Sequence, residues 1–187
     1  DRFVYNLKSN RNLLEQVNDT SDGQFPIAII LSCMDSRTSV ELIFDLGLGD
    51  AFSTRIAGNI VNDDILGSME FACKLAGSKL IVVLGHTHCG AIKGAVTEAK
   101  LDHLTGLLAK IKPAVDFVQQ GIPAHSYPDK DDLVQKVADK NVQLTVNQIR
   151  EHSSLLAAME QAGEIAIVGG MYDIETGKVD FFQTAQS

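Results

Sequence analysis

Two short stretches of the chain, SCMDSR and GHTHCG, contain side chains that could bind a metal ion. The second stretch places His86, His88 and Cys89 within four residues, and the first contains Cys33. Imidazole and thiolate are the ligands that zinc prefers in proteins. Cys33, Cys89 and one of the two histidines would supply three ligands and leave a fourth position open, which is typical of a catalytic rather than a structural zinc site.

The choice between His86 and His88 depends on where the preceding strand ends. On an extended strand both rings would point to the same side, and both could bind one ion. Gly85 and Gly90 instead indicate a strand that ends here and a helix that follows. Residues three apart converge in such a turn more readily than residues two apart, which favours His86 with Cys89. A position at a helix N-terminus would also favour the Cys89 thiolate.

Each of these residues has a simpler interpretation when it is taken alone. A buried cysteine is usually a small apolar residue, as we expect of Cys73 within an amphipathic helix. A lone H-x-x-C pattern is a weak signal of a metal site. The combination is more specific, because the candidate ligands follow two separate apolar runs and because Asp35 and Arg37 lie just beyond Cys33.

Composition restricts the class of protein. The 187 residues are 45% hydrophobic and 21% charged, so we expect residues 1–187 to form a single globular domain. A net charge of −8 without a basic cluster argues against nucleic acid as a partner. No apolar run approaches the ~20 residues that cross a bilayer, so we expect no membrane insertion. Three cysteines suit a metal site or a reducing compartment, and we expect a cytoplasmic protein. The chain begins at Asp1, which keeps a periplasmic location after signal-peptide removal open.

The hydrophobic pattern predicts strands that alternate with helices. We expect strands in the apolar runs at 26–33, 51–58, 79–85 and 164–173, followed by an antiparallel strand at 178–182. We expect helices at 11–18, 39–49, 63–77, from about Gly90, in parts of 101–128, at 129–150 and from Ser153 or Ser154 to Gly163. This order indicates an α/β fold with a mostly parallel sheet of about four strands plus an antiparallel edge strand, flanked by helices. Ligands bind at the carboxyl ends of such strands, where both stretches lie.

Three motifs in order along the chain resemble those of the β-class carbonic anhydrases. They are C-x-D-x-R at residues 33–37, R-x-A-G-N at 55–59 and G-H-x-x-C-G at 85–90. The resemblance runs from about Gln24 to the final strands. It implies a zinc enzyme that reversibly hydrates carbon dioxide to bicarbonate and a proton, with one Zn²⁺ per chain. It also implies a homodimer or a dimer of dimers with the active site at the subunit interface, and a helical N-terminal arm, for which residues 1–18 are the candidate.

The resemblance assigns roles to individual residues. It implies that Cys33, His86 and Cys89 bind the zinc. Asp35 would accept the hydrogen bond of zinc-bound hydroxide, and Arg37 would hold Asp35 in place and ionised. The substrate-binding positions that match the family are Gln24, Phe52, Ala57, Phe71 and Gly90.

Some members of this family also have a non-catalytic bicarbonate site of Trp, Arg and Tyr, and in these members the aspartate moves onto zinc at lower pH. The matching positions here are Ile30, Arg55 and Tyr172, and the chain contains no tryptophan. We therefore predict that this site is absent or altered and that open, water-bound zinc is the resting state. His88 occupies a variable position, where it could relay protons or be an exposed ring that bonds its neighbours.

Other functions stay open at this point. A carbon disulfide hydrolase could use the same scaffold, and a zinc-bound relative could have lost turnover. The presence of both Asp35 and Arg37 argues against the inactive relative. A thiol-redox protein that uses Cys33 and Cys89 is a third alternative, and the absence of a C-x-x-C motif argues against it.

Overall fold

The central element of the protein is one five-stranded sheet. The computed structural model describes residues 1–120 and 130–182, and within them the strand order is β2-β1-β3-β4-β5. The strands are β1 (Ala28–Ser32), β2 (Ala51–Arg55), β3 (Leu80–His86), β4 (Ala166–Tyr172) and β5 (Val179–Phe181). β1 pairs in parallel with β2 and β3, β3 pairs in parallel with β4, and β5 pairs antiparallel with β4. The predicted mostly parallel sheet with an antiparallel edge strand is therefore confirmed.

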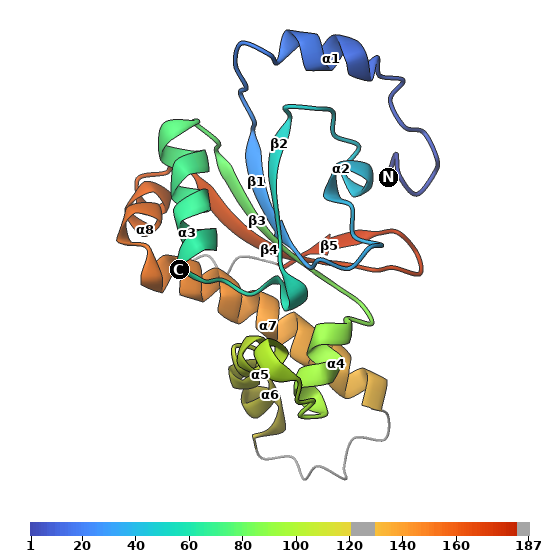
Figure 1. The fold of residues 1–187 in the computed structure, drawn as a ribbon, viewed down its shortest axis with the longest axis vertical. Coiled ribbons are helices and arrows are strands. Elements are labelled where there is room, and N and C mark those ends of the chain that lie inside the picture. Colours follow the sequence, from blue (N-terminus) through green and yellow to red (C-terminus); the bar gives the residue numbers. More distant parts are fainter. Residues whose placement is uncertain (121–129, 183–187) are drawn as a thin grey trace.

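Helices cover both faces of this sheet (Figure 1). The helices of the described residues are α1 (Leu13–Asp19), α2 (Val40–Ile43), α3 (Asp63–Glu70), α4 (Gly90–Val96), α5 (Asp102–Ala109), α6 (Lys112–Gln119), α7 (Lys130–His152) and α8 (Ser154–Gln161), and all but α1 contribute residues to a core. A short 3₁₀ turn spans Ala57–Asn59, and a π-helical turn, Phe71–Leu75, extends α3. Among the described residues, no helix is both long enough and apolar enough to span a membrane.

Alternate residues of the central strands pack into two separate cores. Ile29 and Leu31 of β1 face a large core that includes residues of α3, α4, α6, α7 and α8. Ile30 faces a smaller core on the opposite side, which includes Val40 and Ile43 of α2. Because both faces are covered, the strands read as continuous apolar runs rather than as alternating patterns.

Two predicted helices differ in extent from the observed ones. The helix expected at 39–49 ends after Ile43, and Asp45 adopts a φ of 53° in the left-handed region. Because residues other than glycine rarely adopt this conformation inside a helix, the chain leaves the helix there. The helices predicted in parts of 101–128 are observed as α5 and α6, which end at Gln119. Residues 121–128 lie outside the described residues, as does residue 129, the first residue of the helix predicted at 129–150.

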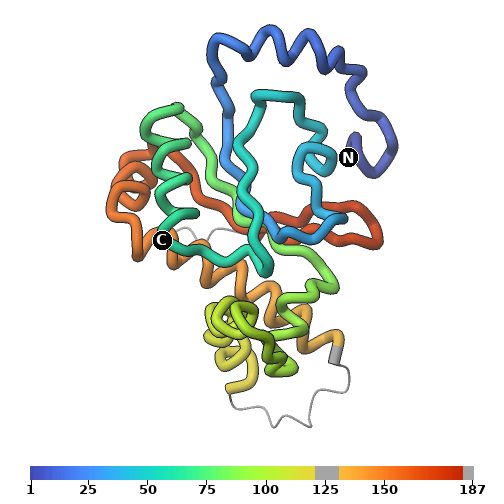
Figure 2. Tube along the Cα trace, viewed as in Figure 1, coloured from blue at the N-terminus to red at the C-terminus, as the bar shows by residue number. Residues whose placement is uncertain are grey.

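The N-terminal segment contacts its own chain at Asp45 and through Phe3, which packs against the smaller core. The largely buried carboxylate of Asp45 accepts hydrogen bonds from the Ser9 N–H at 3.3 Å and from Arg11 Nη1 at 2.5 Å, and it pairs with Arg2 Nε at 2.5 Å. By contrast α1, which follows, has no buried residue and lies at the edge of the structure (Figure 2), where Oε1 of its Gln16 accepts a hydrogen bond from the Leu48 N–H at 3.2 Å. Residues 1–11 are thus attached to their own chain, whereas the apolar side chains of α1 are exposed.

Replacing Asp45 with Asn should loosen residues 1–11. The Arg11 guanidinium lowers the pKa of Asp45, so the ion pairs stabilise the folded segment above the ordinary carboxyl pKa of about 3.9 and are lost as pH falls below it. We expect faster proteolysis of this segment in Asp45→Asn than in the wild type at pH 7. Asp132→Asn, which removes an exposed helical ion pair, should show wild-type cleavage. Equal protection of the segment in Asp45→Asn and the wild type would contradict the expected anchoring.

Candidate functional site

Cys33, His86 and Cys89 meet at the carboxyl ends of β1 and β3. Cys33 directly follows β1, His86 is the last residue of β3, and Cys89 precedes the first residue of α4. Their candidate ligand atoms all lie within 4.8 Å of one another, and each residue is at most 3% exposed. The sheet register explains the convergence, because β1 and β3 are parallel neighbours in which Ser32 pairs with Leu84. His88 is not a member of this cluster.

The donor atoms of the cluster fit a zinc ion. The two sulfur atoms are 3.9 Å apart, close to the ~3.8 Å that a tetrahedral site with Zn–S bonds of about 2.3 Å requires. Nδ1 of His86 contacts the carbonyl oxygen of Thr87 at 2.9 Å, and a carbonyl can only accept, so Nδ1 carries the proton. Nε2 of His86 is buried and has no hydrogen-bond partner among the described residues. A buried polar atom without a partner needs an explanation, and a metal ion facing the two sulfurs provides one.

The two thiols influence each other strongly. The neighbouring Cys89 thiol lowers the pKa of Cys33 well below the usual range of a thiol by hydrogen bonding to its thiolate, and the Gly58 N–H also contacts this sulfur at 3.4 Å. The same contact with Cys33, together with burial, raises the pKa of Cys89. One thiolate therefore forms easily and the second does not. A divalent cation between the two sulfurs would offset the repulsion between two negative charges and allow both side chains to be thiolates.

Asp35 and Arg37 form a bidentate ion pair beside the cluster. Nε of Arg37 donates to Oδ1 of Asp35 at 2.9 Å, and Nη2 donates to Oδ2 at 2.7 Å. The Arg37 side chain holds the pKa of Asp35 well below its usual range. Oδ2 of Asp35 also lies 3.9 Å from Nε2 of His86. An ionised, oriented carboxylate thus borders the three candidate ligands.

Comparison with known proteins identifies the family. A family model described as "Carbonic anhydrase" matches residues 28–179. Carbonic anhydrase 2 of Mycobacterium tuberculosis is 36% identical over 158 residues, which cover 83% of this chain and 74% of that protein. The carbonic anhydrase of Mycolicibacterium smegmatis is 33% identical over 169 residues, with 89% and 80% covered. The solved β-carbonic anhydrase CafA of Aspergillus fumigatus superposes with a TM-score of 0.82 at 26% identity, covering 93% of this chain and 83% of that one. The chain belongs to the β-class carbonic anhydrases.

A further solved structure shows the same fold at lower identity. It comes from work on two tetrameric β-carbonic anhydrases of Sordaria macrospora, and it matches this carbonic anhydrase with a TM-score of 0.80 at 23% identity. The alignment covers 91% of this chain and 90% of that one.

Arg55 and Thr38 hold the backbone between the metal candidate Cys33 and the carboxylate of Asp35. Arg55 donates from Nε to the Cys33 carbonyl at 3.2 Å and from Nη2 to the Asp35 carbonyl. The buried Thr38 hydroxyl contacts the same two carbonyl oxygens at 3.0 and 2.9 Å. The family resemblance matches Arg55 to a residue of a bicarbonate site. It does not predict the hydrogen bonds by which Arg55 supports the backbone of residues 33–35. Its signal in the sequence is the R-x-A-G-N motif, but its partners become visible only with the β1–β2 register.

The residues matched to the substrate pocket are not gathered around the cluster within one chain. The rings of Phe52 and Phe71 lie 6.2 Å apart, edge to face, and line a pocket along β2 and α3 whose lining includes none of the three candidate ligands. Ala57 is half-buried in the 3₁₀ turn. Gln24 is exposed before the amino end of β1, and the strand of about 16 Å separates it from Cys33 at the other end.

Gly90 is open to its surroundings in this carbonic anhydrase. It is the first residue of α4, directly after Cys89, and it is exposed. Apart from its chain neighbours and its own helix backbone, an added Cβ would meet no atom of the described residues within 4 Å. Packing inside the chain therefore does not require a glycine at this position, and the space beside it is free for another molecule.

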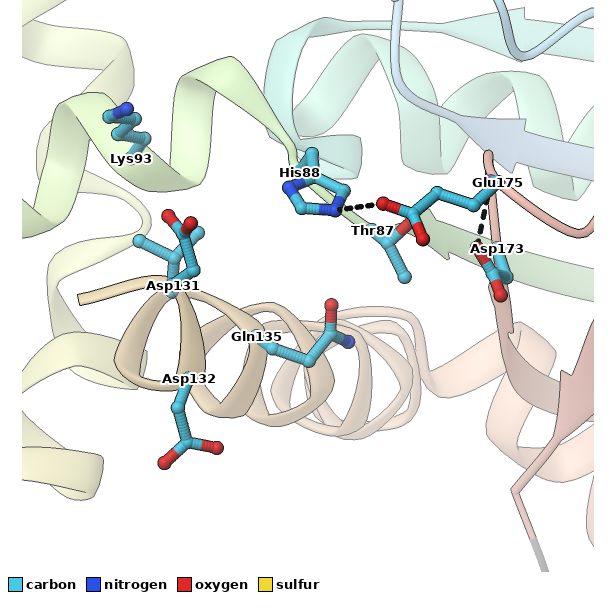
Figure 3. A pocket seen from close by; sticks show the side chains of 9 residues that line it. Thr87, His88, Lys93, Asp131, Asp132, Gln135, Asp173 and Glu175 are labelled. Carbon is cyan, nitrogen blue, oxygen red and sulfur yellow. Dashed lines mark hydrogen bonds and ion pairs between the residues drawn. The ribbon is translucent and has the colours of Figure 1, made fainter. Parts of the chain in front are cut away.

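His88 turns away from an extended path and faces a different pocket. Its φ of 54° ends the extended run of β3, and its Nε2 lies 3.2 Å from Oε1 of Glu175. The half-exposed ring lines a cavity of about 440 Å³ with residues that include Lys93, Asp131 and Asp173 (Figure 3). The contact with Glu175 agrees with the interpretation of His88 as an exposed ring that bonds a neighbour. A role of His88 in proton relay stays a prediction.

Proposed function

We propose that this carbonic anhydrase catalyses the zinc-dependent, reversible hydration of carbon dioxide to bicarbonate and a proton, with one Zn²⁺ held by Cys33, His86 and Cys89. The observation that carries the proposal is the buried Nε2 of His86, which has no hydrogen-bond partner among the described residues. His86 belongs to a cluster with two sulfurs 3.9 Å apart, and its Nε2 lies 3.9 Å from Oδ2 of the ionised Asp35. When bound, zinc supplies a water acidic enough to attack carbon dioxide near neutral pH.

Asp35 orients the attacking group. Both of its oxygens already accept from Arg37, but a carboxylate oxygen has two acceptor sites, so Oδ2 can accept one more hydrogen bond. Through that hydrogen bond Asp35 would hold the attacking water in one orientation toward the substrate. Arg37 keeps the carboxylate ionised and fixed through the bidentate contact. Because two thiolates neutralise the charge of Zn²⁺ and make it a weaker acid, this orientation is important for the rate.

Carbon dioxide is apolar, so its pocket needs apolar walls rather than a charged clamp. Phe52, Ala57 and Phe71 provide such walls, Gln24 donates to a substrate oxygen, and the open side of Gly90 gives access to its N–H. Phe52, Phe71 and Gln24 lie apart from the cluster of their own chain. They serve a site at a subunit interface, where residues of a second copy complete the cleft.

The assembly is a homodimer or a dimer of dimers. Leu13, Leu14 and Val17 of α1 are 50 to 70% exposed, and burying this apolar face against a second copy would stabilise the assembly. Residues 1–18 form the arm that makes this contact, with residues 1–11 fixing its base. The whole of 1–187 acts as one domain. The compartment stays a prediction, cytoplasmic with periplasmic as the alternative.

Stopped-flow carbon dioxide hydration, measured together with the zinc content, tests this function. We expect about one zinc per chain, rapid hydration, loss of hydration when zinc is removed and recovery when zinc is restored. Carbon disulfide should be assayed on the same preparation. A zinc-loaded protein that does not hydrate carbon dioxide would overturn the proposal, in favour of a carbon disulfide hydrolase if that substrate is consumed and of an inactive relative if neither is.

A further inference from the structure

Thr87 connects the candidate ligand His86 to the turn between β4 and β5. Its carbonyl oxygen lies 2.9 Å from Nδ1 of His86. Its N–H donates to the Tyr172 carbonyl at 2.9 Å, at the end of the β3–β4 pairing. Its hydroxyl oxygen accepts from the Ile174 N–H at 3.1 Å. Each of the three polar groups of Thr87 therefore has a partner, and two of these partners lie in or next to the turn.

The carbonyl of Thr87 determines which nitrogen of His86 can bind a metal. A histidine ligand coordinates through the nitrogen that lacks a proton, and the hydrogen bond of the other nitrogen sets this choice. Because a carbonyl cannot donate, it keeps the proton on Nδ1 and leaves the lone pair on Nε2, which is buried and has no hydrogen-bond partner among the described residues. A rotation of the Thr87 peptide would break this contact and free the ring.

The side-chain hydroxyl of Thr87 is placed to resist that rotation, because it is hydrogen-bonded to the turn after β4. His88 has a φ of 54°, so the strand pairing cannot continue past Thr87. The contact of His88 with Glu175 is solvent-exposed, with the two side chains 50% and 73% exposed, and exposed pairs of this kind hold a backbone weakly. The hydrogen bond from the Ile174 N–H to the Thr87 hydroxyl is half-buried and local to the peptide concerned.

We propose that Thr87 is a positioning residue for the metal ligand His86, with its side-chain hydroxyl fixing the peptide whose carbonyl orients the imidazole. This inference rests on the proposed zinc function, because it concerns the orientation of the imidazole that would bind zinc. Thr87 makes no contact with the ion or the substrate in this account, and its effect is on metal affinity and ligand geometry.

The test compares zinc affinity in Thr87→Val, which loses the hydroxyl, and in Thr87→Ser, which keeps it. Affinity is measured on the full chain by competition with a chromophoric chelator, and the Co²⁺-substituted proteins give an absorption spectrum of the ligand field. We expect Thr87→Val to bind zinc about 10- to 100-fold more weakly with an altered cobalt spectrum, as is usual when a partner of a metal-bound histidine is lost. Thr87→Ser should restore the wild-type affinity and spectrum.

Thr176→Val is the matched control, since it removes the hydroxyl that donates to Asp173 at 2.7 Å in the same turn. Wild-type zinc binding by Thr87→Val, or equal weakening in Thr176→Val, would overturn the inference while the zinc site itself remained. Absence of zinc binding in the wild type would instead overturn the proposed function and the inference with it. Should Thr87→Val fail to fold, nitrogen-15 NMR of the metal-free wild type decides, with a proton on Nδ1 of His86 expected and a proton on Nε2 contradicting the role.

Discussion

Cys33→Ser should lose its zinc and lower carbon dioxide hydration by more than about 10³-fold, because the metal supplies the nucleophile and one of only three protein ligands is weakened. The contact between the Cys33 and Cys89 sulfurs, 3.9 Å apart, identifies Cys33 as a member of the pair. Zinc content by elemental analysis and stopped-flow hydration measure the two losses on one sample.

Cys73→Ser is the matched control for this substitution. Cys73 is also buried, at 2% exposure, but burial raises its pKa to about 11, so this thiol stays protonated. It belongs to the π-helical turn after α3 and is not part of the metal-capable cluster. We expect Cys73→Ser to keep its zinc and its activity, with a stability cost of about 1–3 kcal/mol for the buried hydroxyl. Full activity in Cys33→Ser would show that catalysis takes place elsewhere.

Asp35→Asn should lower kcat/KM by about 10²- to 10³-fold and leave the zinc content unchanged, because an amide can accept through one atom only and carries no charge. The bidentate contact with Arg37 would also be lost, so the side chain would no longer be held in one orientation. Zinc stays because Cys33, His86 and Cys89 are untouched. Stopped-flow hydration at saturating zinc measures the effect.

Asp116→Asn provides the comparison for Asp35→Asn. It removes an exposed carboxylate that pairs with Lys112 at 2.8 Å on the surface of α6. Exposed pairs of this kind contribute little, so its hydration rate should equal that of the wild type. If Asp35→Asn also turned over at the wild-type rate with zinc bound, the orienting role of Asp35 would be wrong.

The convergence of Cys33, His86 and Cys89 at one place follows from local signals, whereas their role as zinc ligands is what the family resemblance implies. Cys33 and His86 end two apolar runs, and in a parallel sheet the ends of neighbouring strands meet. The choice of His86 over His88 depended on a turn that the two flanking glycines indicate. The observed φ of 54° at His88 shows this turn directly.

Other features depend on contacts that no local pattern encodes. Arg55 reaches the carbonyls of Cys33 and Asp35 because it pairs with Ser32 across β1 and β2, and this register is known only from the folded sheet. The early end of α2 reflects the contacts of Asp45 with residues near the N-terminus, far away in sequence. Thr87 offered no signal either, because its partner Ile174 lies 87 residues away.

The central claim is an open zinc site made by Cys33, His86 and Cys89, with Asp35 held on Arg37 in the resting state. A crystal structure of the zinc-loaded protein near neutral pH, with anomalous data at the zinc edge, tests it most directly. We expect one anomalous peak per chain, bound by these three side chains and by a solvent molecule. A peak at other residues, or Asp35 as the fourth ligand, would contradict it.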